Sequence, residues 1–381
     1  MTASPIVVSA RNIVKSFGAT RAVRDVSLDI PGGTIMGLVG ENGAGKSTFA
    51  KIIAGIHAPD SGELIIAGQA RSLRNPYEGI RAGVSMMAQE ILLVPDATVE
   101  DNVLLGDLPR RGFLPDRRAI RRRFEELLEF TQFDLSPNDK VGRLRIADQQ
   151  KVEMLRALSQ DARLIIMDEP SAALTTDEVQ RLHQSIRKIA EQGASVLLIS
   201  HFLEEVLALT ERVAVMRDGE MVREGQTAGE TADSLVASMV GKALATDYRD
   251  VEQSRQAPVR LRVSDLTQPG VLDSISFEVR EGEILGLAGL IGSGRTEIAR
   301  CLFGVDRFTG GAIEIDGVPL SIRTPTQAIE QGLFMVPESR KEQGLVLVAP
   351  ISDNLVLAST SKLARFGITS QRKIRNVAQR L

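Results

Sequence analysis

The sequence predicts an α/β protein with two similar domains in tandem, and two observations support this prediction. The segment from Asp25 to Gln89 matches the segment from Ser274 to Glu338 over 65 positions without a gap, at a constant offset of 249. Short apolar runs also alternate with helical patterns along the first of these domains. Such alternation is typical of a mostly parallel sheet that is covered by helices on both faces.

The repeat sets the expected domain boundaries. Shared strand and helix patterning alone would not keep glycines in register at Gly40/Gly289, Gly45/Gly294, Gly62/Gly311, Gly68/Gly317 and Gly83/Gly332. We expect a first domain at 5–241, a polar linker at 242–258 and a second domain at 259–381. Because the second domain is much shorter than the first, we expect it to be incomplete.

The first domain contains the individual elements that predict this fold. Apolar runs at 35–39, 164–167 and 196–199 have the length of buried strands. The segments 117–130 and 176–191 have the apolar spacing of helices. The strands are therefore expected to form the sheet, with the helices packed on its faces.

Composition excludes several classes of function. The chain has 381 residues, 43% hydrophobic and 25% charged, and a net charge of −3, so no strongly basic field is available to bind nucleic acid. Its one cysteine, Cys301, rules out an intrachain disulfide. We see no signal peptide, and no apolar run reaches the roughly 20 residues that span a bilayer. Any membrane role is expected to be peripheral and to depend on a partner.

The sequence GENGAGKST follows the apolar run at 35–39 and precedes a helical segment. It fits the phosphate-binding pattern G-x-x-x-x-G-K-[ST]. Lys46 is expected to reach the β- and γ-phosphates of ATP, and the Ser47 hydroxyl to bind Mg²⁺. The loop as a whole predicts a P-loop NTPase fold, with a chance match as the alternative. The expected nucleotide-contacting residues are Gly40, Glu41, Asn42, Gly43, Ala44, Gly45, Lys46, Ser47 and Thr48.

Three further positions follow apolar runs and complete the predicted chemistry. Asp168 ends the run LIIMD and is expected to bind Mg²⁺, and Glu169 is the candidate to polarise the attacking water. His201 follows VLLIS and could contact the γ-phosphate or orient that water. Gln89 ends VSMMAQ and could join the same metal and water network, although an isolated glutamine would be a solvated loop residue.

These motifs, with ADQQKVEMLRAL, DEPSAAL and LLISH in that order, resemble those of ATP-binding-cassette ATPases. The stretches SHFLEEVLALTERVAVMRDG and MVPESRKEQGLVL are similar to the tandem cassettes of bacterial monosaccharide importers. The resemblance implies an antiparallel β subdomain, a helical subdomain at 92–160 that faces a permease, and a Phe17 ring that stacks on adenine. It also implies a transmembrane permease as partner, a sugar-binding protein as an indirect one, and a peripheral location at the cytoplasmic face of the bacterial inner membrane.

The chain departs from the family pattern at the signature motif. Cassettes of this family carry a sequence close to L-S-G-G-Q, whose serine and glycines contact the γ-phosphate in the opposite domain. Here Arg145 replaces the serine, Ala147 the second glycine and Asp148 the glutamine. The hydroxyl is lost, and a carboxylate near phosphate would repel it. Arg145 could pair with phosphate instead.

The second P-loop also departs from the pattern, at the repeat positions Gly289, Gly294, Arg295 and Thr296. Arginine stands in the place of lysine, and the two side chains are not interchangeable. Glu338 replaces the glutamine of the repeat, and no aromatic residue matches Phe17. The resemblance implies that the altered signature and the altered P-loop share one composite site. We therefore expect one competent site and one that binds nucleotide but hydrolyses it poorly.

Three alternatives remain open from the sequence. The cargo could be a nucleoside or a furanose-like signal, because cassette residues touch ATP and permease rather than cargo. The chain could be a cassette protein acting outside transport, although such proteins usually keep two intact P-loops. It could also be a regulatory module without useful hydrolysis, against which Asp168, Glu169 and His201 argue. We expect no chemical role for His57 or His183.

Overall fold

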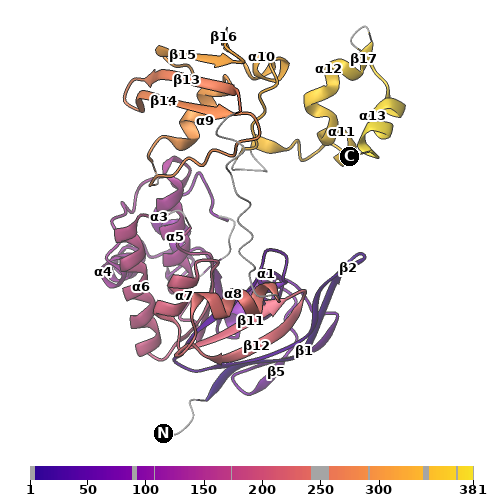
Figure 1. The fold of residues 1–381 in the computed structure, drawn as a ribbon. Coiled ribbons are helices and arrows are strands. Elements are labelled where there is room, and N and C mark those ends of the chain that lie inside the picture. Colours follow the sequence, from indigo (N-terminus) through magenta and orange to yellow (C-terminus); the bar gives the residue numbers. More distant parts are fainter. Residues whose placement is uncertain are drawn as a thin grey trace. The chain divides into compact units, whose positions relative to one another are not determined.

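The computed structural model describes residues 5–87, 92–106, 108–172, 174–241, 257–290, 292–337, 343–365 and 368–380. The chain forms two compact units, Met1–Thr246 and Asp247–Leu381 (Figure 1). Most of the linker expected at 242–258 lies outside the described residues.

An antiparallel sheet begins the first unit, in the order β2-β1-β4-β5. The pairing is antiparallel throughout, and β1 joins both β2 and β4. This sheet is the antiparallel subdomain that the family resemblance implies. Its strands are β1 (Ile6–Phe17), β2 (Thr20–Pro31), β4 (Ser61–Ile66) and β5 (Gln69–Arg71).

A second, mostly parallel sheet forms the centre of the first unit, in the order β12-β11-β3-β10-β9-β6. Only the pair β11 and β12 is antiparallel among its described pairings. The apolar runs at 35–39, 164–167 and 196–199 lie in its middle strands. The six strands are β3 (Ile35–Val39), β6 (Val84–Met87), β9 (Leu164–Asp168), β10 (Ser195–Ile199), β11 (Arg212–Arg217) and β12 (Glu220–Gln226).

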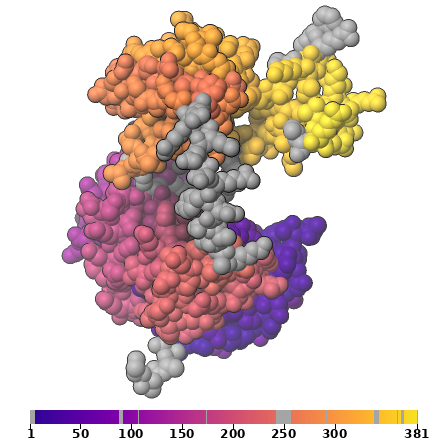
Figure 2. Space-filling model, viewed as in Figure 1, coloured from indigo at the N-terminus to yellow at the C-terminus, as the bar shows by residue number. Residues whose placement is uncertain are grey.

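Helices cover the central sheet and form the helical subdomain. Figure 1 shows α3, α4, α5 and α6 gathered on one side of the unit and β1 and β2 on the other, and Figure 2 shows these regions in magenta and indigo. A small hairpin of β7 (Arg110–Arg111) and β8 (Leu114–Pro115) precedes α4. The helices are α1 (Lys46–Ile53), α2 (Pro76–Arg81), α3 (Val99–Val103), α4 (Arg117–Thr131), α5 (Ile146–Leu158), α6 (Thr176–Glu191), α7 (Leu203–Leu209) and α8 (Ala232–Val240).

The alternation of side chains along the central strands explains why the sheet is buried on both faces. On β9, Leu164 and Ile166 pack into a core with α1 and the antiparallel sheet, whereas Ile165 and Met167 pack into a core with the helical subdomain. The residues of β10 divide between the same two cores in the same way. Successive side chains of a strand point to opposite faces, so a run of consecutive apolar residues fits a doubly covered sheet.

The second unit contains an antiparallel sheet in the order β14-β13-β15-β16. Its core includes Leu266, Ile298 and Cys301, which join the sheet to the helix that follows the second P-loop. The strands and helices are β13 (Val259–Gln268), β14 (Leu272–Arg280), α9 (Arg295–Leu302), β15 (Gly310–Ile315), β16 (Val318–Leu320), α10 (Pro325–Glu330), α11 (Ile351–Val356), α12 (Thr360–Leu363), β17 (Ala364–Arg365), β18 (Ile368–Thr369) and α13 (Gln371–Ala378).

The parallel sheet is not repeated among the described residues of the second unit. The repeat places the counterpart of β3 at 284–288, but this segment forms no strand, and Ile284 is 97% exposed. In the first unit β3 pairs with β10 and β11. The 65 aligned positions of the repeat hold no counterpart of those two strands. A strand needs hydrogen-bonded neighbours, and the described residues of this unit supply none for this segment.

Candidate active site

The predicted site residues of the first unit follow three neighbouring parallel strands. The order β3-β10-β9 places Leu38, Ile199 and Asp168 in one row of the sheet. The loop after β3, the Asp168–Glu169 pair and His201 therefore lie together at one sheet edge. This is the edge at which open α/β sheets bind their ligands.

Lys46 begins α1 and folds back over the phosphate-binding loop. Its Nζ donates hydrogen bonds to the carbonyl oxygens of Gly40 at 2.7 Å and Glu41 at 2.9 Å. Burial lowers the pKa of Lys46, while the carboxylates of Asp168 and Glu169 oppose this shift. The ammonium is thus held against the loop that is predicted to bind the β- and γ-phosphates.

Gly45 explains why the loop needs a glycine directly before α1. It is the N-cap residue of α1, with φ of 96°, and an added Cβ would collide with the carbonyl oxygen of Ala22. A residue with a side chain would be strained there by both its backbone and this contact. The backbone amides at the start of α1 remain available for an anion, which helix N-termini favour.

Asp168 has the properties of a magnesium ligand. The residue is buried, and its Oδ2 has no hydrogen-bond partner among the described residues. Burial raises the pKa of Asp168, and a hydrogen bond from Ser47 lowers it in part. Buried carboxylate oxygens without a partner are costly, and a carboxylate with a hydroxyl is a donor set that suits Mg²⁺. Ser47 and Asp168 therefore fit the predicted metal.

Glu169 and His201 form a direct pair. The Oε1 atom of Glu169 lies 3.0 Å from Nδ1 of His201. Glu169 has a left-handed backbone, with φ of 55°, and its N–H donates to the carbonyl oxygen of Ile199 at 2.8 Å. A non-glycine residue in this conformation costs energy, and such strain is common at functional sites. The structure brings together the two residues that the sequence predicts for water activation.

Phe17 lies at the end of β1 and is 46% exposed, so it is not a core residue. Its ring and the His57 ring pack in a T-shaped arrangement with centroids 5.3 Å apart, and Lys15 Nζ lies 5.6 Å from the Phe17 centroid. An exposed aromatic face is available for stacking. His57, for which the sequence suggests no role, thus supports the ring. Gln89 lies outside the described residues.

Ion pairs at the altered signature neutralise the acid that the sequence analysis expects to repel phosphate. Asp148 Oδ2 accepts from Arg145 Nε at 3.1 Å, and Asp148 Oδ1 accepts from Lys151 Nζ at 2.8 Å. Lys151 also pairs with Glu178 Oε1 at 2.6 Å. The negative charge of Asp148 is therefore balanced within the unit, at the start of α5.

Low pH should weaken the ion pairs around Lys151, because it protonates the carboxylate of Glu178. Burial would raise the pKa of Glu178, but the Lys151 ion pair and hydrogen bonds from Thr175 lower it to about 2, from 4.5. A carboxylate with a lowered folded-state pKa stabilises the fold above its unfolded pKa and loses this contribution as pH falls. We expect Glu178→Gln to cost about 1–2 kcal/mol at pH 7 and progressively less between pH 4.5 and 2, measured by urea unfolding. The exposed neighbour Asp177, changed to Asn, is the control; equal losses at pH 7 and 2 would contradict the prediction.

The second P-loop keeps only part of the geometry of the first. Gly294 is the N-cap residue of α9 with φ of 89°, as Gly45 is for α1. Arg295 and Thr296 are exposed in the first turn of α9, and Gly289 lies against Ser293. Among the described residues of this unit, no strand carries an Asp–Glu pair to this loop. The described part of this unit thus holds the predicted phosphate-contacting residues, but no counterpart of Asp168 and Glu169.

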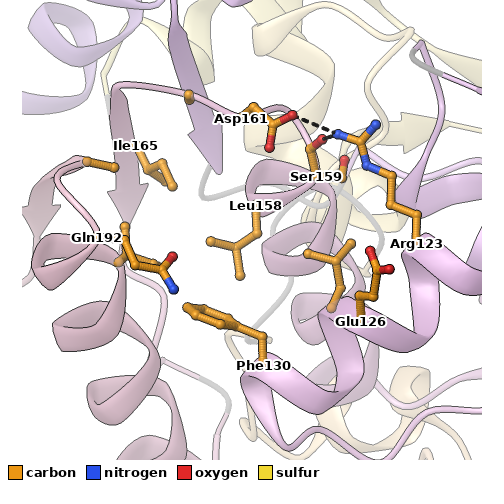
Figure 3. Close-up of a pocket in the computed structure, with 12 residues that line it drawn as sticks. Arg123, Glu126, Phe130, Leu158, Ser159, Asp161, Ile165 and Gln192 are labelled. Atoms are coloured by element: carbon orange, nitrogen blue, oxygen red, sulfur yellow. Dashed lines mark hydrogen bonds and ion pairs between the residues drawn. The ribbon is translucent and has the colours of Figure 1, made fainter.

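A cavity of about 420 Å³ in the first unit lies away from these residues (Figure 3). It is bounded by side chains from α4 and α5 and by Ile165, and Arg123 hydrogen-bonds Asp161 at its rim. None of the predicted nucleotide-contacting residues lines it. The candidate site is therefore the group of residues at the carboxyl ends of β3, β10 and β9, and not this cavity.

Sequence reasoning misses a buried group beside the site. Glu205 on α7 contacts Ser171, Ser200 and His183, and none of these four residues belongs to a predicted site. One signal is present in the sequence. Glu205, Val206 and Leu209 share the buried face of α7, so an acidic residue occupies a core position there. Acidic residues are seldom buried unless they are paired, so an acidic residue on the apolar face of a predicted helix indicates a buried polar partner.

Comparisons with known proteins agree with this geometry. The family model described as ABC transporter matches residues 23–172 and 272–380. A ribose import ATP-binding protein of Streptomyces avermitilis is 43% identical over 366 residues, which cover 96% of this chain and 72% of that protein. A ribose import ATP-binding protein of Yersinia pestis is 41% identical, over 97% of this chain and 73% of the relative.

Solved structures resemble the fold. An ATP-binding cassette of an ABC transporter, crystallised in its ADP conformation, is 25% identical with a TM-score of 0.55, covering 63% of this chain and all of that one. A dimeric cassette in a post-hydrolysis state, bound to ADP and phosphate, is 26% identical with a TM-score of 0.53, covering 58% and 100%. The predicted α/β P-loop fold is confirmed by these similarities. The tandem P-loops, the repeat and the relatives together place this chain in the ABC transporter family.

Proposed function

We propose that this chain binds and hydrolyses ATP to power the import of a monosaccharide through a partner membrane permease. The arrangement of Lys46, Asp168 and the Glu169–His201 pair at adjacent strand ends carries the proposal. The names of the relatives, which are ribose import ATP-binding proteins, favour ribose or a similar sugar. The permease and, indirectly, a sugar-binding protein are the expected partners.

The residues of the first unit have distinct roles in this proposal. Lys46 and the amides at the start of α1 bind the β- and γ-phosphates, and Phe17 stacks on adenine. Ser47 and Asp168 would hold Mg²⁺, which neutralises charge on the phosphates when bound. Glu169 accepts a proton from the attacking water, and His201 holds Glu169 and the γ-phosphate in position. Gln89 is proposed to join the metal and water network.

The second P-loop is proposed to contact nucleotide without supporting turnover. Gly289, Gly294, Arg295 and Thr296 form its loop and helix start. An arginine in the place of Lys46 still offers positive charge, but as a wider planar group.

The proposed location is the cytoplasmic face of the bacterial inner membrane, through the permease. Among the described residues, no helix has the length and apolar content that crossing a bilayer requires.

Uptake measurements test the proposed cargo. We expect deletion of the gene to abolish high-affinity uptake of radiolabelled ribose, and the wild-type gene, but not Lys46→Ala, to restore it. Uptake of a sugar with a different transport system is the control. Normal ribose uptake in the deletion strain, with loss of another solute, would reassign the cargo while leaving the ATPase intact.

A further inference from the structure

Glu205 is a buried carboxylate that lies next to the active site without belonging to it. The residue is 6% exposed, on α7. Burial raises the pKa of Glu205, but hydrogen bonds from His183, Ser200 and Ser171 outweigh burial and lower it. The group is therefore a charged acceptor held in the protein interior. Such a charge is costly unless every bond to it is made.

Two of its partners come from the segments that carry the catalytic pair. Glu205 Oε2 accepts from Ser171 Oγ at 3.0 Å and from Ser200 Oγ at 2.7 Å. Ser171 follows Glu169 by two residues, and Ser200 directly precedes His201. One carboxylate oxygen thus joins the two loops whose side chains meet in the Glu169–His201 contact.

The hydroxyl of Ser200 also shapes the turn that presents His201. It accepts a hydrogen bond from the N–H of Phe202 at 3.1 Å while it donates to Glu205. These hydrogen bonds fix Ser200 and Phe202, the residues directly before and after His201 in the sequence. The turn is anchored to α7 through Glu205 rather than through the exposed imidazole itself.

His183 supplies the third contact, from α6. Its Nε2 lies 3.2 Å from Glu205 Oε1. Because an ionised carboxylate only accepts, Nε2 must carry the proton in this contact. Both oxygens of Glu205 are thus engaged, and α6 is tied to the same point as the two loops.

The backbone conformation of Glu169 depends on contacts such as these. Glu169 is held at φ of 55°, and this conformation persists only where the surroundings fix it. The hydrogen bond from the Glu169 N–H to the carbonyl oxygen of Ile199 holds the backbone at Glu169 itself. The Ser171–Glu205 bond fixes the chain two residues further on.

We propose that Glu205 is a positioning residue for ATP hydrolysis, which sets the geometry of Glu169 and His201 through Ser171 and Ser200. This inference rests on the proposed ATPase function. It predicts that Glu205 affects the rate of the chemical step and leaves ATP binding almost unchanged, because none of its hydrogen bonds to described residues involves the phosphate-binding loop. A role in folding alone would change stability without changing turnover of the folded protein.

The first test compares Glu205→Gln with Glu204→Gln in the assembled transporter. The two changes are chemically identical, and Glu204 is exposed on the same helix. Glutamine is neutral, and it accepts at one of its two positions while its amide group donates at the other, so it cannot accept at both the Oε1 and the Oε2 positions as Glu205 does. We expect Glu205→Gln to lower kcat at least about tenfold with KM for ATP within about twofold, since small displacements of catalytic groups have effects of this size. Glu204→Gln should match the wild type.

The serines keep the proposal testable if Glu205→Gln does not fold, as judged by circular dichroism and thermal melting. Ser171→Ala and Ser200→Ala each remove one donor, and each should lower kcat about threefold to tenfold. The loss in the double variant Ser200→Ala/Glu205→Gln should be smaller than the product of the two single losses, because the two residues share one hydrogen bond.

Four outcomes of these measurements would contradict the proposals. Equal kcat for Glu205→Gln, Glu204→Gln and the wild type would overturn the inference alone. Wild-type kcat in both serine variants, or a rise in KM with unchanged kcat, would also overturn it. A wild-type transporter that hydrolyses no ATP would instead remove the proposed function on which the inference depends.

Discussion

Lys46→Ala should abolish high-affinity ATP binding by the isolated chain. In the structure Lys46 Nζ is bound to the carbonyl oxygens of Gly40 and Glu41, so the side chain already lies over the phosphate-binding loop. Triphosphate would replace these neutral acceptors with charged ones, and hydrogen bonds between charged groups are about twice as strong as neutral ones. We expect the Kd for ATP to rise at least about 100-fold, measured by titration calorimetry or with a fluorescent ATP analogue.

Two further variants provide a control and an intermediate case for this experiment. Lys140→Ala removes an exposed lysine of the same unit and should leave the affinity unchanged. Lys46→Arg places in the first loop the residue that the second loop has at Arg295. It should bind ATP more weakly than the wild type and more tightly than Lys46→Ala. Unchanged affinity in Lys46→Ala would remove the phosphate-binding role of the loop.

The sequence was sufficient to predict the architecture of the first unit because its signals are local. The strands β3, β9 and β10 are continuous apolar runs, and each ends at the residues that carry the predicted chemistry. Since these strands are parallel neighbours, their carboxyl ends had to meet at one edge. The Glu169–His201 contact follows from that topology, although its 3.0 Å distance does not.

Contacts between distant segments could not be predicted. Nothing in the sequence pairs Phe17 with His57, or Lys151 with Glu178, because neither pair shares a helix turn or a strand register. The contacts of Glu205 join two loops and two helices and have no sequence motif of their own. In the second unit the repeat aligns the residues at 284–288 with strand β3 of the first unit. Pairing partners decide whether an apolar segment becomes a strand, and the described residues of that unit supply none for it.

Glu169→Gln should bind ATP but hydrolyse it very slowly. Glutamine has nearly the shape of glutamate and can still accept a hydrogen bond from His201, so the pair can persist. It cannot take a proton from water. General-base catalysis contributes about 10²–10⁴ in rate, so we expect kcat of the assembled transporter to fall at least about 100-fold. Affinity for ATP should stay the same or increase, because a negative charge beside the γ-phosphate is removed.

His201→Ala separates the two roles in the pair. If Glu169 is the base and His201 orients it, the histidine variant should keep a measurable fraction of turnover, whereas Glu169→Gln should trap ATP unhydrolysed. The amount of ATP that remains with each variant after incubation, and the fraction converted to ADP, distinguish these states. If Glu169→Gln kept wild-type turnover while His201→Ala lost it, the proton acceptor would have to be the imidazole. Glu169 would then be the residue that holds it, with the Nδ1 contact at 3.0 Å leaving Nε2 to face the water.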